Sequence, residues 1–186
     1  MINPHYDLDL KWTGLVVGLA LLVAHVFALL QPRTVQGVLQ KFPRNHTAGG
    51  ALMLLNAVWA FWLVSTMDLG EFYTLRNKLQ WGIPIATVLV ILYVEDFLAV
   101  RALGTTMLLG ACILLDTAWF EDGPGVVLLP LLAYAWILVA FFWVGMPYLL
   151  RDLLQWISSS KGRWRALCLA GAACGALLFG CALFFY

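Results

Sequence analysis

Long, nearly uninterrupted apolar runs dominate the sequence and limit what the chain can fold into. A helix that crosses a bilayer needs about 20 consecutive, mainly apolar residues, and six runs are about that long. They cover residues 13–30, 48–67, 81–98, 102–120, 126–149 and 164–185. Strands of a membrane barrel are about ten residues long and alternate in polarity, so these runs predict helices. We expect an all-α membrane bundle that forms one domain over residues 1–186.

The composition agrees with a membrane protein. Hydrophobic residues make up 63% of the 186 residues and charged residues 11%, and the mean hydropathy is +0.89. Soluble domains are about half apolar and about a quarter charged, so the excess apolar surface has to face lipid. The net charge of +1 gives no electrostatic reason to expect a nucleic-acid partner.

The polar breaks between the runs predict the loops, and one break is hard to place. Most breaks contain proline or glycine, which are typical turn residues. Residues 81–120 have no proline in their middle, yet at about 1.5 Å per residue one helix over them would be much longer than a bilayer is thick. We therefore place a tight hairpin at 99–104, with Arg101 at its tip.

Lysine and arginine divide unequally between the two sides of the expected bundle. If the loop 31–47 is on the inner side, that side carries eight of them and the other side three. The eight are Arg33, Lys41, Arg44, Arg101, Arg151, Lys161, Arg163 and Arg165, and the three are Lys11, Arg76 and Lys78. Cytoplasmic loops carry the excess of positive charge. We therefore expect six spans in a bacterial cytoplasmic (inner) membrane, with both termini on the non-cytoplasmic side.

Two inner segments are longer than turns and have apolar residues at helical spacing. They are residues 31–47 and 150–163. This pattern predicts short amphipathic helices on the inner surface of the membrane. Such helices either cap and orient the bundle or offer a docking surface to a partner.

Ionisable residues within the apolar runs are few, and such residues are costly in a bilayer and often functional. Glu95, Asp96 and Arg101 form the densest group, and His25 lies in the inner half of the first run. The group either pins the expected hairpin, handles protons or cations together with His25, or forms a salt bridge to another subunit. For His25 we expect a buried, hydrogen-bonded ring, because no second histidine falls in a span to complete a haem site.

Small residues at four-residue spacing predict a helix-packing face. They are Gly14 and Gly18 in the first run and Gly171 and Gly175 in the last run, where Cys174 adds to the face from an adjoining stripe. Small side chains let two membrane helices approach closely. The face packs either within this chain or against another one.

Motifs of known enzyme classes are absent from the sequence, including G-x-S-x-G, H-E-x-x-H and the phosphate-binding loop. We predict no catalytic residue, metal ligand or cofactor. Our first hypothesis is a non-catalytic structural or accessory subunit, with the bilayer and other membrane subunits or its own copies as partners. One alternative is a small proton- or cation-linked transporter or channel that uses Glu95, Asp96 and Arg101. Another is a membrane enzyme acting on lipid, with residues 93–101, Arg151 and Asp152 as its one candidate cluster.

Overall fold

A computed structural model describes residues 6, 8–94, 96–119, 121, 123 and 125–186, and over these residues the chain is helical without strands. The all-α prediction is confirmed. The α-helices are α1 (Leu10–Leu30), α2 (Pro32–Lys41), α3 (His46–Thr66), α4 (Arg76–Tyr93), α5 (Leu98–Ala118), α6 (Leu128–Gly145), α7 (Tyr148–Ser158) and α8 (Lys161–Phe184). Two short 3₁₀ helices, η1 (Phe42–Arg44) and η2 (Gly70–Leu75), precede α3 and α4.

In the described part of the chain, five helices are long and apolar enough to cross a membrane: α1, α3, α5, α6 and α8. They have 18 to 24 residues, which indicates an integral membrane protein. The helix α4 has 18 residues but is not one of the five. The reason is local, because four of its first five residues are Arg76, Asn77, Lys78 and Gln80. Five of the six predicted spans therefore correspond to helices that can cross a membrane, and the sixth, α4, is not confirmed.

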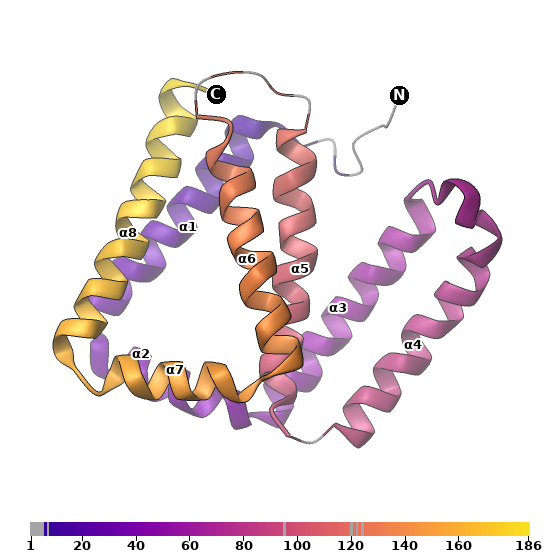
Figure 1. Cartoon of the computed structure of the whole chain (residues 1–186), viewed down its shortest axis with the longest axis horizontal. Helices are drawn as coiled ribbons and strands as arrows, with labels where there is room; N and C mark the ends of the chain where they lie inside the picture. Colours follow the sequence, from indigo (N-terminus) through magenta and orange to yellow (C-terminus); the bar gives the residue numbers. More distant parts are fainter. Residues whose placement is uncertain (1–5, 7, 95, 120, 122, 124) are drawn as a thin grey trace.

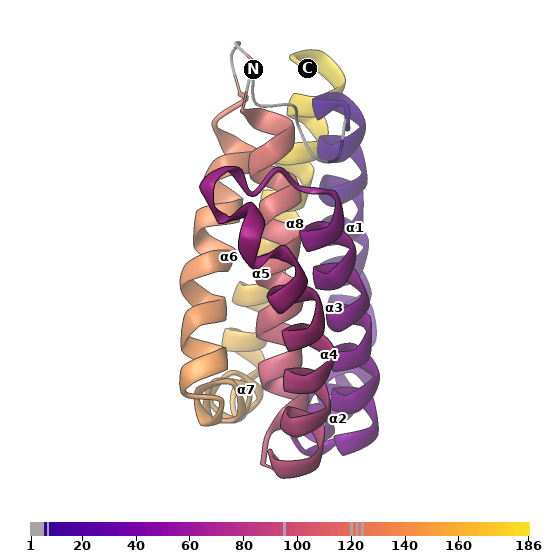
Figure 2. The same ribbon diagram turned by 90° about the vertical axis from the view of Figure 1, so that its right-hand side faces the viewer.

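The neighbours α1/α8, α5/α6 and α3/α4 are antiparallel, whereas α3 and α5 run in the same direction (Figure 1). The first helix α1 packs against the last helix α8, α5 packs against both α6 and α3, and α4 packs against α3. Seen from the side, the axes of the long helices are roughly aligned, whichever way the chain runs along them (Figure 2). The short helices α2 and α7 run across one end of the bundle, beside one another (Figure 1). Both expected amphipathic segments are thus helices, and they lie at the same end.

The turn between α4 and α5 lies earlier than expected. The helix α4 ends at Tyr93 and α5 begins at Leu98, after Phe97 in a left-handed conformation (φ 55°). Residues 99–104 are helical and do not form a hairpin. The cause is packing, because this stretch supplies much of the buried face of α5, and burial against neighbouring helices favours continued helix. Arg101 therefore lies in the first turns of a helix and not at a hairpin tip.

The run 126–149 also divides differently from the expectation. The helix α6 ends at Gly145 and α7 begins at Tyr148, so the last residues of the run belong to the crossing helix. Pro147 lies at the junction. Because proline has no N–H to donate, it favours a helix start and breaks a helix interior.

Glycine allows the backbones of α1 and α8 to touch. A Cβ added at Gly18 would lie 2.6 Å from the Phe179 nitrogen, and one at Gly175 would lie 2.6 Å from the Leu22 nitrogen. Real Cβ atoms do not approach backbone so closely, so a larger residue at either position must push the helices apart. This contact joins the two ends of the chain.

Two hydrophobic clusters hold the α1/α8 pair to the rest of the molecule. One lies toward the chain termini and includes Leu10, Leu114, Leu129 and Leu178, from α1, α5, α6 and α8. The other lies at the opposite end and includes the residues Ala28, Ile157, Trp164 and Cys168. There the Trp164 Nε1–H also donates a hydrogen bond to the Ala28 carbonyl over 3.0 Å.

We predict that Gly175→Val destabilises the protein by about 2 kcal/mol or more, since overpacking typically costs about 1–3 kcal/mol and backbone atoms cannot yield as side chains do. The matched control is Gly180→Val in the same helix, where an added Cβ meets nothing within 4 Å. Unfolding in mixed micelles measures both variants. Equal stability of the two would show that the glycine contact is not needed.

Candidate functional site

A buried polar network joins α3 to α5 in the middle of the bundle. The Asn56 amide donates to the Ala102 carbonyl over 2.8 Å, and the Thr106 hydroxyl lies 2.9 Å from the Asn56 Oδ1, to which it donates. Asn56 is 2% exposed. All of its described polar contacts are to protein groups, which fits a role in joining helices.

Arg101 extends from α5 toward α6, and its Nη1 donates to the Val144 carbonyl over 3.0 Å. It lines a cavity of about 310 Å³ with residues from α3, α4 and α6, including Met53, Thr87 and Val90. Its Nε is buried and has no hydrogen-bond partner among the described residues. An arginine held this way fixes the start of α5 against the end of α6.

The candidate ionisable residues lie in separate places. Asp96 is exposed in the turn between α4 and α5, Arg101 is half-buried between helices, and His25 is on α1. Glu95 lies outside the described residues. Over the described residues, the only ion pair joins the neighbouring side chains Arg151 and Asp152 over 2.7 Å. No group of three or more His, Cys, Asp or Glu in this part of the chain could hold a metal ion.

His25 fills the space that the missing side chain of Gly171 leaves. A Cβ added at Gly171 would lie 2.2 Å from the imidazole ring of His25. The His25 Nδ1–H donates to the Leu21 carbonyl over 2.8 Å. These contacts place His25 in the α1/α8 interface as a packed, hydrogen-bonded side chain.

Most of the expected small-residue face lies in this same interface. Gly14 faces Ala182 and Tyr186, and Gly18 faces Gly175. Cys174 is an exception, because its side chain is exposed and points away from the close contact. A four-residue step along a helix keeps one face, whereas Cys174 is one residue before Gly175 and is turned by about 100°.

Tyr6 contributes contacts that the sequence analysis missed. Its hydroxyl accepts a hydrogen bond from the Trp59 indole over 2.9 Å, its backbone N–H donates to the Asp116 carboxylate, and its ring lies 5.6 Å from that of Trp62. Burial raises the pKa of the Tyr6 phenol, which the hydrogen bond from Trp59 partly offsets. Tyr6 thereby ties the N-terminal segment to α3 and α5.

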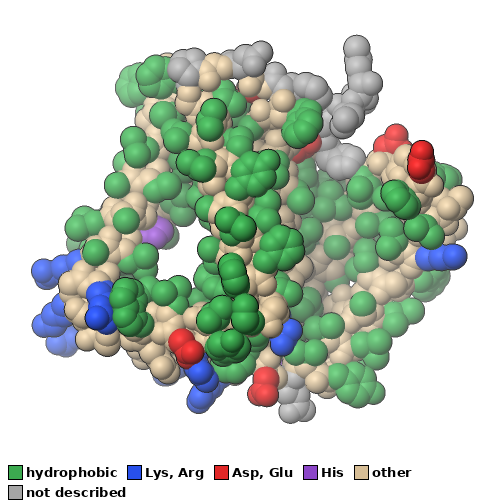
Figure 3. All heavy atoms as spheres, in the orientation of Figure 1, with side chains coloured by type: hydrophobic (Ala, Val, Ile, Leu, Met, Phe, Trp, Pro, Cys, Tyr) green, Lys and Arg blue, Asp and Glu red, His purple; other side chains and the backbone are tan. Residues whose placement is uncertain are grey.

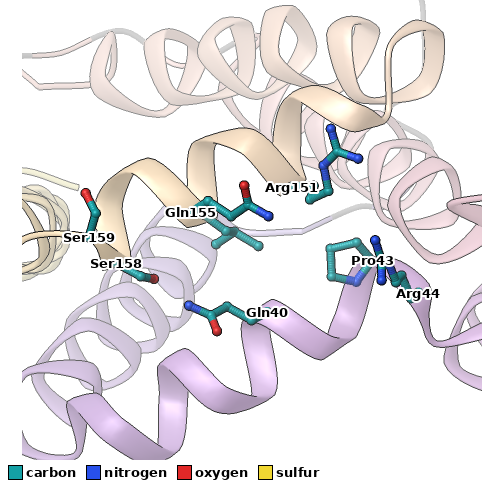
Figure 4. A pocket seen from close by; sticks show the side chains of 8 residues that line it. Gln40, Pro43, Arg44, Arg151, Gln155, Ser158 and Ser159 are labelled. Atoms are coloured by element: carbon teal, nitrogen blue, oxygen red, sulfur yellow. The ribbon is translucent and has the colours of Figure 1, made fainter.

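A polar pocket of about 410 Å³ has α2 and η1 on one side and α7 on the other (Figure 4). Gln40, Pro43 and Arg44 line it from one side. From the other side come Arg151, Leu154, Gln155 and Ser158 of α7 and its C-cap Ser159, which recur at helical spacing on one face. The sequence analysis had noted both amphipathic segments but not that they face each other, because sequence spacing does not give the position of one helix beside another.

Comparison with known proteins adds no family to this description. No family model matches the chain, and no curated protein or solved structure is significantly similar to it.

We predict that Asn56 and Thr106 are energetically coupled. A double-mutant cycle with Asn56→Leu and Thr106→Val should give a coupling energy of about 0.6 to 1.7 kcal/mol, the range measured for hydrogen bonds between membrane helices. In the control cycle, Thr105→Val replaces Thr106→Val, because the Thr105 hydroxyl donates only to the Arg101 carbonyl of its own helix. Coupling near zero in both cycles would contradict a stabilising network.

Proposed function

We propose that this protein is a non-catalytic structural or accessory subunit of a larger membrane complex. The observation that carries the proposal is the open arrangement of its helices, which leaves long apolar faces without a partner from this chain. Membrane helices associate by close packing and interhelical hydrogen bonds. A frame with unpacked faces is suited to receive helices of other subunits.

The helix α4 has the least packed of these faces. Thr87 is its only buried residue, and the long helix against which it chiefly packs is α3. Trp81 and Leu92 are 73% and 64% exposed, and Ile85, Val88 and Leu89 are also exposed. The exposed face of α4 is therefore apolar, and it supports contact with lipid or with a neighbouring helix.

A second open region separates the α1/α8 pair from α6. Figure 3 shows a gap through the molecule between these helices, above α7. The hydrophobic clusters that join the two parts lie toward the two ends of the bundle. Lipid chains or a helix of another subunit fill such a gap in a membrane.

The proposal includes α4 as a sixth span and places both termini outside a bacterial cytoplasmic membrane. The distribution of charge supports this orientation. Most blue Lys and Arg side chains in Figure 3 lie around α2, α7 and the start of α8, and the acidic loop near η2 lies toward the opposite end. The positive-inside rule then assigns the α2/α7 end to the cytoplasm.

We predict that positions 71 and 96 face opposite sides of the membrane. In a variant with all four cysteines replaced by alanine, Glu71→Cys should react with an impermeant maleimide in intact cells. Asp96→Cys should react only after permeabilisation, because α4 lies between the two positions. Gly37→Cys in α2 is a matched control for the inner side, since an added side chain there meets nothing within 4 Å. Labelling of 71 and 96 from the same side would show that α4 does not cross.

We further predict that the protein purifies in mild detergent from its native source with stoichiometric foreign membrane subunits. Ile85→Trp with Leu92→Trp on α4 should reduce the amount of these subunits by about half or more, because the larger rings hinder close packing but remain apolar. Leu138→Trp is the control, at an equally exposed position of α6. Native mass spectrometry reads out the composition. A lone monomer or a pure homo-oligomer of the unaltered protein would overturn the proposal.

A further inference from the structure

The pocket between α2 and α7 combines positive charge with neutral hydrogen-bonding groups. Its lining contains two arginines, two glutamines and two serines, with no carboxylate among the described residues. Arg44 is exposed and makes no side-chain hydrogen bond or ion pair with the described residues. The pocket therefore offers a positive charge that no described carboxylate neutralises.

Two further groups in the pocket are partly or wholly without partners. The Ser158 hydroxyl is buried and has no hydrogen-bond partner among the described residues. Arg151 uses Nε and Nη2 to bind Asp152 and lies over the Phe97 ring, which leaves its Nη1 available. Arg44 and the Arg151 Nη1 are thus the charged donors that the pocket offers to an oxygen-rich anion.

An apolar groove lies on another face of α7. It has a volume of about 500 Å³ and is lined by Val139, Phe142, Trp143, Leu149, Asp152, Leu153 and Trp156. A helix is about 10–12 Å across, and one leaflet is about 20 Å thick. The polar pocket and the apolar groove are thus separated by less than the length of one phospholipid.

The location of the pocket matches a lipid headgroup. The helices α2 and α7 are amphipathic and run across the end of the bundle that carries most of the Lys and Arg residues. Basic pockets at the cytoplasmic ends of membrane helices bind anionic headgroups. A soluble phosphate has the same anionic group but no apolar chain that would occupy the groove.

We propose that the pocket binds the phosphate of an anionic phospholipid from the inner leaflet. Arg44 and Arg151 bind the phosphate, and Gln40 and Gln155, farther along the pocket (Figure 4), bind the polar remainder of the headgroup. An acyl chain then follows α7 into the apolar groove beside Trp143 and Trp156. This site requires no partner subunit, so it is independent of the proposed assembly role, while its assignment to the inner leaflet rests on the proposed orientation.

The test measures lipid binding to the purified full chain. Native mass spectrometry follows retention of phosphatidylglycerol and of phosphatidylcholine with the same acyl chains. Phosphatidylglycerol should bind one to one and at least about tenfold more tightly. Arg44→Gln with Arg151→Gln should abolish this preference, and Arg44→Gln alone should weaken binding about threefold or more. The single variant keeps the test valid if loss of Arg151 disturbs folding. The Arg44 side chain is exposed and makes no hydrogen bond or ion pair with the described residues, so its replacement should not affect folding.

The control variant Arg33→Gln with Arg165→Gln removes the same charge from the same end outside the pocket, and its lipid preference should stay within about twofold. Unchanged binding in both arginine variants of the pocket, or equal affinity for the two lipids, would overturn the site. A further arm adds inorganic phosphate without lipid. Arginine-dependent binding of phosphate with no preference between the lipids would assign the pocket to a soluble anion and also overturn the lipid proposal.

Discussion

The close approach of α1 and α8 is the interaction on which the rest of the structure depends. Gly18 and Gly175 let two backbones meet with no side chain between them. Lipid is as apolar as the helix surfaces, so the hydrophobic effect does not hold the helices together. Dispersion does, because its attraction falls off steeply with distance and is strongest where the backbones touch. Because α1 and α8 lie at opposite ends of the helix order, their contact brings distant parts of the chain together. The crossing helices α2 and α7 then come to lie side by side at one end.

The bundle is joined at its two ends and open between them. The clusters around Leu129 and around Trp164 fix the α1/α8 pair to the remaining helices, while α4 is packed on one side only. A soluble protein with these exposed faces would aggregate. In a bilayer the same faces are solvated by lipid, so the open arrangement leaves room for additional helices without exposing the backbone.

The sequence predicted the helices well because bilayer thickness sets their length, and it indicated the glycine face because only small residues permit close approach. It misplaced the turn before α5, since Val100 and Ala102 are buried by tertiary contacts that local pattern does not reveal. It also grouped His25 with Asp96 and Arg101, whereas the hydrogen bonds of His25 and Arg101 in the structure go to backbone carbonyls of Leu21 and Val144. The α2/α7 pocket was not predictable, because it depends on how two distant segments are placed side by side.

The pairing of the first and last helices also sets an order of events during synthesis. Gly18 and Gly175 are 157 positions apart (175 − 18), and translation at about 5–20 residues per second needs about 8 to 30 s to cover that distance. During this time the glycine face of α1 has no α8 to bind and is in contact with lipid or with helices of other proteins. The α1/α8 contact therefore forms only after the five α-helices of the chain between α2 and α8 have been synthesised and α8 has entered the membrane.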